Sequence, residues 1–401
     1  MTATHTVGDR LVVDVGSVAH GGSCVARFEG QVVFVRGALP GERVVVSITE
    51  APGHGRFMRA DTVEVLDSSA HRVTPPCRYA SECGGCDWQY GALAEQRQLK
   101  AQVVREQLVR VGGESPQRWS ELEVEAVPGD RDGLAWRTRV RFAVEHGRAG
   151  LHPPRSHRVI DIDECLLAVD GIRDLRITRE EWPGASDVLA VAPSQGPALA
   201  LADPHAGQAR IVEQAVGRTW TFDATAFWQV HPGAPDALAG AVADALLPRA
   251  GEHALDLYCG VGLFAGALAP ALGPGGRIDA VESDAIAMSG ARRSLHDLST
   301  VHLHERPVEK WLRETNLRRC DLVVLDPPRK GAGAAVIERV LRMRPRAVAY
   351  VACDPASLAR DVATAKKLGW ALTGLRAFDL FPMTHHVECV ALLESRDSLG
   401  A

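Results

Sequence analysis

The stretch ALDLYCGVGLFAGAL, residues 254–268, decides the fold, because it reads as an apolar strand that turns at glycines into an apolar helix. A glycine-rich turn between a strand and a helix lets a ligand approach the backbone closely. Glu282 stands twenty positions after Gly262, at the end of the next strand-like run, where an acidic side chain binds ribose hydroxyls. A plain tight turn is the alternative, but the turn and the acid together favour a nucleoside cofactor.

Short apolar runs alternate with helical stretches from about residue 225 onward. This alternation is typical of a doubly wound parallel sheet, so we predict a Rossmann-like α/β domain over residues 223–401. The last two runs, 371–375 and 387–393, have no helix between them, and we expect an antiparallel pair at the sheet edge. The other strand-like runs are residues 254–258, 277–281, 301–303, 322–325 and 347–351.

The N-terminal part has a different pattern. Strand-like runs at residues 11–15, 31–35 and 42–46 are separated by glycine and proline turns. This spacing favours a small β-barrel over residues 1–70.

Residues 71–222 are predicted to form a β-rich central domain. The segment begins with a cysteine-rich stretch, followed by an amphipathic helix over residues 92–111. The tract 185–207 is rich in alanine, proline and glycine, and we expect a loop there.

The composition fits a soluble globular chain of two or three domains, with 401 residues, 46% apolar and 24% charged. No apolar run approaches the roughly 18 residues needed to cross a membrane. Residues 1–10 lack the apolar core of a secretion signal, so we expect a cytoplasmic protein without a membrane partner. The net charge of −5 argues weakly against nucleic-acid binding, although a local basic face is compatible with it. The sequence does not indicate an oligomeric state.

Three chemically active side chains stand at the ends of strands in the predicted sheet. Asp326 begins an Asp-Pro-Pro-Arg motif after the fourth strand, Cys353 follows the fifth, and Glu388 begins the otherwise apolar last strand. Because ligands bind at the carboxyl edge of such sheets, we expect these side chains near the cofactor. A rigid turn at Asp326 and an inert buried thiol at Cys353 are the alternatives.

Together these segments resemble the RNA uracil-C5 methyltransferase family, which uses S-adenosylmethionine to methylate C5 of a uridine. The resemblance covers the whole C-terminal domain and implies a class I methyltransferase fold. The N-terminal barrel is similar to the TRAM domain, an OB-like RNA-binding module found in many family members. The matching segments are AFWQV (226–230), DLYCGVG (256–262), DPPRKG (326–331), YVACDPASLARD (350–361), FDLFP (378–382) and HVE (386–388).

The resemblance assigns roles by position. Cys353 would be the nucleophile and Glu388 the base. The residues that would line the cofactor and uracil site are Gln229, Tyr258, Gly260, Gly262, Glu282 and Asp326. The family often has Ser-Cys-Asn around the nucleophile, an asparagine after the Phe-x-Gln-Val segment and a polar residue after the glycine turn. This chain departs from that pattern, with the nucleophile intact, at Ala352, Asp354, His231 and Leu263.

The expected reaction explains these residue types. Attack of a thiolate on uracil C6 turns the base into an enolate, which activates C5 toward the methyl group. A carboxylate such as Glu388 then removes the C5 proton so that Cys353 can leave. Since a free cysteine with a pKa of about 8.5 is mostly protonated at neutral pH, we expect the site to favour the thiolate.

Four cysteines of the central domain have the spacing of a metal site. Three lie in CRYASECGGC, residues 77–86, and the fourth follows after a long gap. Four thiolates fit zinc or an iron–sulfur cluster, and the Cys-x2-Cys spacing alone slightly favours zinc. The family resemblance implies a structural 4Fe–4S cluster, and unliganded thiols are the alternative. The expected ligands are Cys77, Cys83, Cys86 and Cys165.

Three arginines alternate in WRTRVRF, residues 136–142. Residues two apart in a strand share a face, so these guanidinium groups would form a row that binds RNA phosphates. A solvated strand face is the alternative. The predicted row is Arg137, Arg139 and Arg141, with Arg155, His157 and Arg158 adding to it.

RNA is therefore the expected partner, with its target uridine flipped out to reach the nucleophile. The barrel and four-cysteine layout resembles family members acting on ribosomal RNA more than those acting on transfer RNA. Two other functions stay open. A methyltransferase of exocyclic nitrogens also uses an Asp-Pro-Pro motif but needs no nucleophilic cysteine. A non-catalytic iron–sulfur RNA-binding protein would need neither Cys353 nor Glu388.

Overall fold

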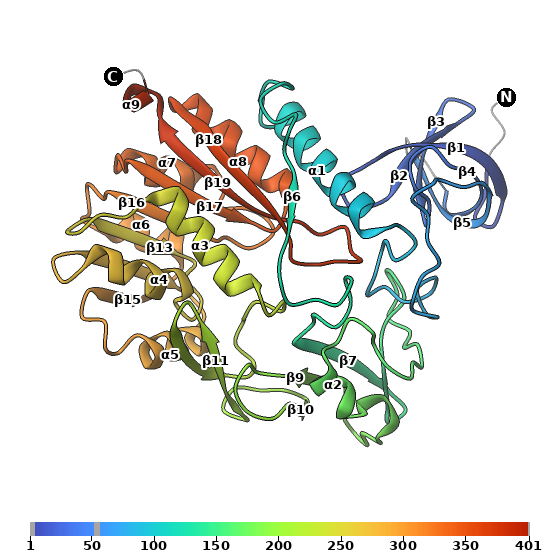
Figure 1. Cartoon of the computed structure of the whole chain (residues 1–401), viewed down its shortest axis with the longest axis horizontal. Coiled ribbons are helices and arrows are strands. Elements are labelled where there is room, and N and C mark those ends of the chain that lie inside the picture. The colour runs from blue at the N-terminus through green and yellow to red at the C-terminus, as the bar shows by residue number, and fades with distance from the viewer. Residues whose placement is uncertain (1–4, 52–56, 400–401) are drawn as a thin grey trace.

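The computed structural model describes residues 5–51 and 57–399. Figure 1 shows a barrel on one side, a large sheet covered by helices on the other, and a smaller β-rich region below both. Of the predicted domains, residues 1–4, 52–56 and 400–401 lie outside the described residues, and the domain boundaries stay a prediction. No helix in the described part of the chain is long and apolar enough to cross a membrane.

The predicted N-terminal barrel is confirmed. Five strands close on themselves in the order β1-β2-β3-β5-β4. Buried residues alternate with exposed ones along β1, so that Leu11, Val13 and Val15 fill the barrel interior. The sequence pattern does not predict β2, which is only five residues long. The strands are β1 (Arg10–Val18), β2 (Cys24–Phe28), β3 (Gln31–Arg36), β4 (Arg43–Glu50) and β5 (Phe57–Asp67).

Helix α1 (Leu93–Arg110) confirms the predicted helix and lies between the barrel and the large sheet (Figure 1). Leu99 contributes to the barrel core, whereas Val104 and Leu108 contribute to a core on the sheet. The helix packs against α8 (Pro355–Lys367) of that sheet. Because one helix contributes to both cores, it fixes the barrel beside the sheet.

The central region contains a four-stranded sheet in the order β10-β9-β7-β8 and a hairpin of β11 and β12. The prediction of a loop over residues 185–207 is wrong, because β9 and β10 lie within it and pair with each other. β9 pairs with β7 and is buried along most of its length, which stabilises this five-residue strand. The elements are β7 (Arg139–Glu145), β8 (Arg148–Gly150), α2 (Asp170–Asp174), the 3-10 helix η1 (Ile177–Arg179), β9 (Asp187–Val191), β10 (Leu199–Ala202), β11 (Arg210–Ala215) and β12 (Arg218–Asp223).

The predicted α/β domain is confirmed as an eight-stranded sheet in the order β15-β14-β13-β16-β17-β19-β18-β6. Its middle strands are parallel, and β19 runs antiparallel to both of its neighbours. The strands are β13 (His253–Leu257), β14 (Arg277–Glu282), β15 (Val301–Glu305), β16 (Leu322–Leu325), β17 (Ala347–Ala352), β18 (Trp370–Asp379) and β19 (Glu388–Ser395). The other helices are α3 (Ala234–Leu246), α4 (Leu263–Leu272), α5 (Ala285–Ser294), α6 (Val308–Glu314), α7 (Ala334–Arg342) and α9 (Arg396–Leu399).

The predicted place of the last two strands at the sheet edge is wrong. β6 (Val124–Ala126), from the central part of the chain, pairs in parallel with β18 and forms the edge. A three-residue strand so far from its partner in sequence leaves no periodic signal. The C-terminal sheet is therefore completed by a segment outside the predicted C-terminal domain.

The strand order brings the C-terminal ends of β13, β16 and β17 together, and the antiparallel β19 begins at the same edge. Tyr258, Asp326 and Cys353 directly follow the three parallel strands. Glu388 is the first residue of β19. The fold thus gathers side chains from four strands at the edge where doubly wound sheets bind ligands.

Candidate active site

A pocket of about 480 Å³ opens at this edge. Six of the eight residues predicted for catalysis and cofactor binding line it, and Gly262 and Glu282 do not. Three further lining residues, Phe227, Arg329 and Phe381, received no role from the sequence. Each lies inside one of the family-like motifs, and this position was the one feature of the sequence that could have predicted a role in the site. The six predicted lining residues are Gln229, Tyr258, Gly260, Asp326, Cys353 and Glu388.

The two glycines of the turn have different tasks. Gly262 is the N-cap of α4 with φ of 90°, and a Cβ there would lie 2.5 Å from Leu295 Cδ1. Gly260 has φ of 56° but open space where its Cβ would point. Gly262 therefore permits the packing of the turn, whereas Gly260 leaves room for a ligand against the backbone.

The acidic groups beside the turn bind its backbone. Glu282 accepts hydrogen bonds from three backbone N–H groups, including that of Gly260 at 3.0 Å. The predicted contact of Glu282 with a ribose stays a prediction. Asp256, which received no role from the sequence, accepts a bond from the N–H of Ala265 at 2.8 Å. Burial raises the pKa of Asp256 to about 7, and its Oδ1 has no hydrogen-bond partner among the described residues.

Cys353 and Glu388 come together through strand register. Ala352 of β17 pairs with Cys389 of β19 in antiparallel register, so the next residues, Cys353 and Glu388, face each other at the edge. Both side chains line the pocket. Glu388 is only 4% exposed, which explains why a carboxyl group stands at the start of an apolar strand. The register gives the pair a common site although 35 positions separate them in sequence.

The electrostatics of the pocket favour protonated acids. Burial and the charge of Asp326 raise the pKa of Glu388 well above its ordinary value, while Arg329 lowers it. Burial, Asp256 and Glu282 raise the pKa of Asp326 to about 7. The pocket therefore holds acids that take up a proton near neutral pH or above.

The prediction that the site favours the Cys353 thiolate is wrong for this structure. Burial, Glu388 and Asp326 raise the pKa of Cys353 to about 12, against the opposing effect of Arg329. The physical reason is that the thiol is partly withdrawn from water and shares its surroundings with three carboxyl groups, Glu388, Asp326 and Asp354, and one cation, Arg329. In this structure the surroundings of Cys353 therefore favour the protonated thiol.

The four departures from the family pattern have separate surroundings. Asp354 caps α8 by accepting the N–H of Ser357 at 2.7 Å, and it pairs with His20 of the barrel at 2.7 Å. Hydrogen bonds from these partners lower the pKa of Asp354 to about 2. Leu263 lines the pocket, whereas the buried His231 stacks on Trp136 with ring centroids 6.1 Å apart. Ala352 is buried within β17.

The predicted alignment of Arg137, Arg139 and Arg141 along one strand face is wrong, and the binding of these arginines to RNA phosphates stays a prediction. Arg139 is turned inward, where its Nη2 donates to the backbone carbonyl of Ala224 and, at 2.8 Å, to that of Ala226. These carbonyls directly precede the pocket residues Phe227 to Gln229. Burial lowers the pKa of Arg139 to about 10, so the guanidinium stays charged at neutral pH. Arg139 therefore supports the pocket wall.

The other basic residues of that row also have partners. Arg137 donates to the Gly85 carbonyl at 2.8 Å, and Arg141 donates to Asp187 at 2.8 Å. Arg137 precedes β7, so the three arginines do not share one strand. The remaining partners are Glu50 for Arg155, Glu82 for Arg158 and the ring of His152 for His157.

The four predicted metal ligands are free thiols, Cys83 buried and the other three half-buried. Among the described residues, no group of three or more His, Cys, Asp or Glu side chains has the arrangement to hold a metal ion. Burial is the main cause that raises the pKa of Cys77, Cys83 and Cys86, and the charge of Cys165 adds to it. The cluster thus stays a prediction.

Two further hollows extend from the pocket toward the barrel. One of about 200 Å³ shares Arg329 and Cys353 with the pocket and is also lined by His20. The next, of about 510 Å³, shares Gly21, Gly22 and His385 with the first and reaches the barrel surface at Phe34 and Arg59. Cys353 therefore lines a hollow on the barrel side as well as the pocket at the turn.

Comparison with known proteins fits this architecture. Residues 5–61 match the TRAM domain, and residues 240–396 match the tRNA (Uracil-5-)-methyltransferase family. An uncharacterized RNA methyltransferase of Streptomyces avermitilis is 45% identical, with 97% of this chain and 99% of that protein covered. One of Bifidobacterium longum is 36% identical, with 95% of each chain covered.

A solved structure shares the whole fold. The crystal structure of Pyrococcus abyssi tRNA (uracil-54, C5)-methyltransferase in complex with S-adenosyl-L-homocysteine has a TM-score of 0.69 and 21% sequence identity, and 95% of this chain and 99% of that chain are covered. The matched family and the relatives agree that this protein is an enzyme that methylates RNA. The chain belongs to the tRNA (uracil-5-)-methyltransferase family of RNA methyltransferases and carries an N-terminal TRAM domain.

Proposed function

We propose that the enzyme methylates C5 of a uridine in RNA, with S-adenosylmethionine as cofactor, Cys353 as nucleophile and Glu388 as base. The observation that carries this proposal is the register that sets Cys353 opposite Glu388 in one pocket. A thiol opposite a buried acid fits addition to C6 followed by proton removal from C5. Methylation of an exocyclic nitrogen needs neither attack by a thiol nor proton removal from C5.

The pocket fits the proposed cofactor. Gly260 leaves its backbone open to a ligand, and Asp256 has a buried oxygen without a partner among the described residues. Tyr258 and Phe264 add aromatic walls for an adenosine, with Gln229 and Asp326 nearby for the polar groups. S-adenosylmethionine supplies the electrophilic methyl group when it is bound there.

Cys353 begins the reaction. Its pKa of about 12 keeps the thiol protonated, so the proton must pass to a neighbouring carboxylate as the sulfur approaches C6. Asp326, with a pKa of about 7, is charged often enough to accept it. The S–C6 bond forms as the C5–C6 π electrons move toward O4, and Arg329 is the neighbouring cation that stabilises the negative charge.

Glu388 completes the reaction. After C5 has gained the methyl group, it still carries the proton that must leave. The Glu388 carboxylate takes this proton, the electron pair of the C5–H bond restores the C5–C6 double bond, and the S–C6 bond breaks to return the sulfur to Cys353. The raised pKa of Glu388 makes it a strong base in its ionised form.

RNA would approach along the two hollows between the barrel and the pocket. Arg59 stacks over both Phe34 and Phe57, whose rings meet edge to face. Arg59 and Phe34 line the larger hollow. Aromatic and arginine surfaces of this kind bind unpaired bases on OB-like barrels. The smaller hollow then leads past His20 to Cys353. A flipped uridine would enter the pocket at the end of this path.

For the substrate we propose ribosomal RNA over transfer RNA, from the barrel and four-cysteine layout. The test is to map 5-methyluridine by mass spectrometry in both RNAs from a strain without this gene. Loss of one 5-methyluridine from ribosomal RNA supports the assignment. Loss from transfer RNA alone overturns the choice of substrate but not the reaction.

We also propose that Cys77, Cys83, Cys86 and Cys165 hold a 4Fe–4S cluster. Four thiolates are the donor set that such a cluster would take from this chain. Backbone and side-chain N–H groups already point at these sulfurs, from Gly85 to Cys83 at 3.4 Å and from Gln89 to Cys86 at 2.9 Å. Such donors are typical of the surroundings of bound thiolates.

Anaerobic purification tests the cluster. The protein should be brown, with iron and sulfide in equal amounts, and replacement of Cys86 by Ser should remove the colour. Colourless protein with one equivalent of zinc would overturn the assignment. The readouts are absorption and elemental analysis, so they do not depend on methyl transfer.

The product identifies the reaction. Labelled cofactor and RNA are incubated with the enzyme, and the nucleosides are separated by liquid chromatography with mass spectrometry. The expected product is 5-methyluridine, absent with Cys353→Ala. A methyl group on an exocyclic nitrogen, or full activity of Cys353→Ala, would refute the proposed reaction.

A further inference from the structure

The β18–β19 loop, residues 380–387, carries pocket residues at both of its ends. Phe381 near its start lines the pocket, and Glu388 follows its last residue. The loop consists of turns and bends, and Met383 within it has φ of 66°, a left-handed conformation that disfavours a side chain. Partners outside the loop must therefore hold this conformation.

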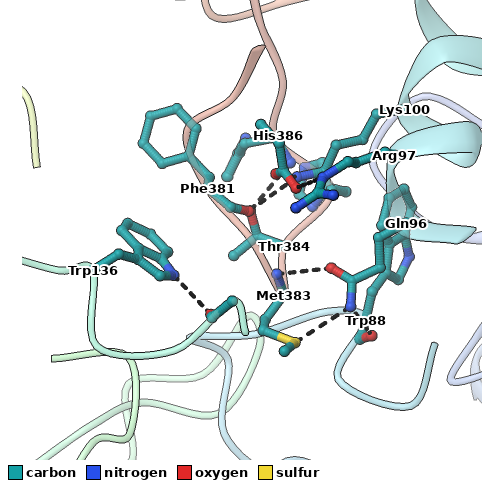
Figure 2. A network of polar contacts seen from close by, with 12 residues as sticks. Trp88, Gln96, Arg97, Lys100, Trp136, Phe381, Met383, Thr384 and His386 are labelled. Carbon is teal, nitrogen blue, oxygen red and sulfur yellow. Dashed lines mark hydrogen bonds and ion pairs between the residues drawn. The ribbon is translucent and has the colours of Figure 1, made fainter. Parts of the chain in front are cut away.

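Helix α1 supplies such a partner in a fully buried lysine. The Lys100 ammonium lies 2.5 Å from the Asp379 carboxylate at the end of β18, and both side chains are 0% exposed. The same ammonium donates to the backbone carbonyl of Phe381 at 3.0 Å (Figure 2). Thr384 Oγ1 donates to that carbonyl at 2.8 Å. One lysine thus joins the end of the strand to the start of the loop.

A glutamine one turn earlier on α1 holds the middle of the loop. Gln96 Oε1 accepts the N–H of Met383 at 2.8 Å (Figure 2). Its Nε2 donates to the carbonyls of Trp88 at 3.0 Å and Gly91 at 2.8 Å. The Met383 carbonyl in turn accepts the N–H of Trp88 at 3.1 Å. The loop is therefore fixed from α1 and from the cysteine-rich segment together.

Stability alone is a weak reason for this arrangement. Removing two charges from water costs several kcal/mol per ion, and apolar replacements of buried ion pairs are often neutral or stabilising. An apolar pair has no donor for a backbone carbonyl, so it could not orient the loop backbone. The Lys100 ammonium fixes the Phe381 carbonyl relative to Asp379, and the Phe381 ring meets His386 edge to face at 5.9 Å.

We propose that Lys100 is a positioning residue for the methyl-transfer reaction: from helix α1, through Asp379 and the Phe381 carbonyl, it holds the β18–β19 loop so that Glu388 reaches the C5 proton. This inference rests on the proposed function of Cys353 and Glu388. Lys100 does not line the pocket, and it acts only through the loop.

A loosened loop should slow proton removal by Glu388 and leave the attack by Cys353 unchanged. Cys353 stands at the end of β17, so its attack on C6 does not depend on the loop. Proton removal by Glu388 does, and a displacement of about 1 Å costs on the order of 100-fold in rate. Lys100→Met should therefore slow turnover about 30- to 100-fold and accumulate the covalent protein–RNA adduct. Cofactor affinity should change less than about threefold.

The chain offers a matched control. Arg97 also donates to Asp379, at 3.1 Å, but not to the Phe381 carbonyl. Arg97→Met thus removes a cation from the same carboxylate and leaves the loop contact intact. Lys100→Met leaves the buried Asp379 carboxylate with one partner fewer, and this variant could misfold for that reason. The double variant Lys100→Met/Asp379→Leu removes both charges and so tests the loop without an unpaired buried carboxylate. Lys100→Arg keeps charge and donors.

Each variant is assayed for thermal unfolding, turnover, adduct on a denaturing gel and hydrogen exchange of residues 380–387. We expect adduct and faster loop exchange in Lys100→Met and in the double variant, even where the latter unfolds at the wild-type temperature. Arg97→Met should show neither, and Lys100→Arg should recover part of the turnover. A folded double variant with wild-type turnover and no adduct overturns the inference.

The two levels of proposal fail differently. If Glu388→Gln accumulates adduct but the Lys100 variants turn over normally, only the positioning role is wrong. If no adduct forms in any variant and Cys353→Ala is active, the proposed function itself is wrong, whatever the loop exchange shows.

Discussion

The sheet edge at the pocket and the central region differ in how far their side-chain positions can be predicted from the sequence. At the edge, Tyr258, Asp326 and Cys353 each follow a strand directly, so local sequence and strand order were enough to bring them together. In the central region, the partners are distant backbone groups. Arg139, which the strand pattern assigned to RNA, instead binds the carbonyls of Ala224 and Ala226.

The difference teaches where sequence reasoning is dependable. Residues at the ends of parallel strands converge because the topology leaves them only one edge. A charged side chain in an irregular region turns toward whichever acceptor the tertiary structure provides. The central region thus supports the wall of the pocket through Arg139.

Arg139 gives the largest expected effect. Arg139→Met should destabilise the protein by about 3 kcal/mol or more, because two carbonyls lose a charged donor. The wall at Phe227 to Gln229 should loosen, so affinity for S-adenosylhomocysteine falls, while the salt dependence of RNA binding stays unchanged. Urea unfolding and calorimetry measure these changes.

Arg141→Met is the matched control, since its pair with Asp187 is exposed and worth at most about 1 kcal/mol. If Arg139→Met instead flattens the salt dependence of RNA binding and spares cofactor affinity, the phosphate-binding interpretation of this strand returns.

The pKa of Cys353 gives the next effect. With a pKa of about 12, the thiol should react with iodoacetamide about 100-fold more slowly at pH 7 than an ordinary exposed cysteine. Because the thiolate fraction rises with pH, the rate should increase about tenfold per pH unit from pH 7 to 10. Mass spectrometry of the labelled peptide follows it. A plateau below pH 8 would show that the site stabilises the thiolate after all.

Gly262 tests the turn itself. Gly262→Ala should cost about 2 kcal/mol, from the left-handed backbone and from the 2.5 Å approach to the buried Leu295. Gly251→Ala is the control, because φ there is 84° but no atom lies within 4 Å of the added Cβ. Chemical denaturation compares the two. Equal losses would mean that contact with Leu295 adds nothing.

The pair of His20 and Asp354 gives the smallest effect, below about 1 kcal/mol, because both groups are partly exposed. The hydrogen bond between His20 and Asp354 raises the pKa of His20. The stabilisation by the charged imidazole is therefore complete below about pH 6.5 and is lost as pH rises through the raised pKa of His20. It also falls away in strong acid, as pH drops toward the Asp354 pKa of about 2. His20→Ala should lower the unfolding temperature at pH 6 but not at pH 9. Equal shifts at both pH values would argue against the ion pair.

Much of the fold was predictable because barrel and sheet strands carry regular apolar patterns. β6, β9 and β10 were not, since three to five residues hold no period and burial by distant partners decides them. In the site, motif positions predicted six lining residues, but the roles of Arg139 and Lys100 depend on hydrogen bonds between distant segments. The raised pKa of Cys353 likewise depends on neighbours from three strands.

The covalent adduct tests the central claim most directly. Labelled RNA and cofactor are incubated with wild-type enzyme, Cys353→Ala and Glu388→Gln, and the samples are run on a denaturing gel. Glu388→Gln keeps the nucleophile but lacks the base, so we expect a methylated protein–RNA complex that survives denaturation. Cys353→Ala should bind RNA without forming it. Normal turnover by Cys353→Ala would contradict covalent catalysis, and free turnover by Glu388→Gln would require another base.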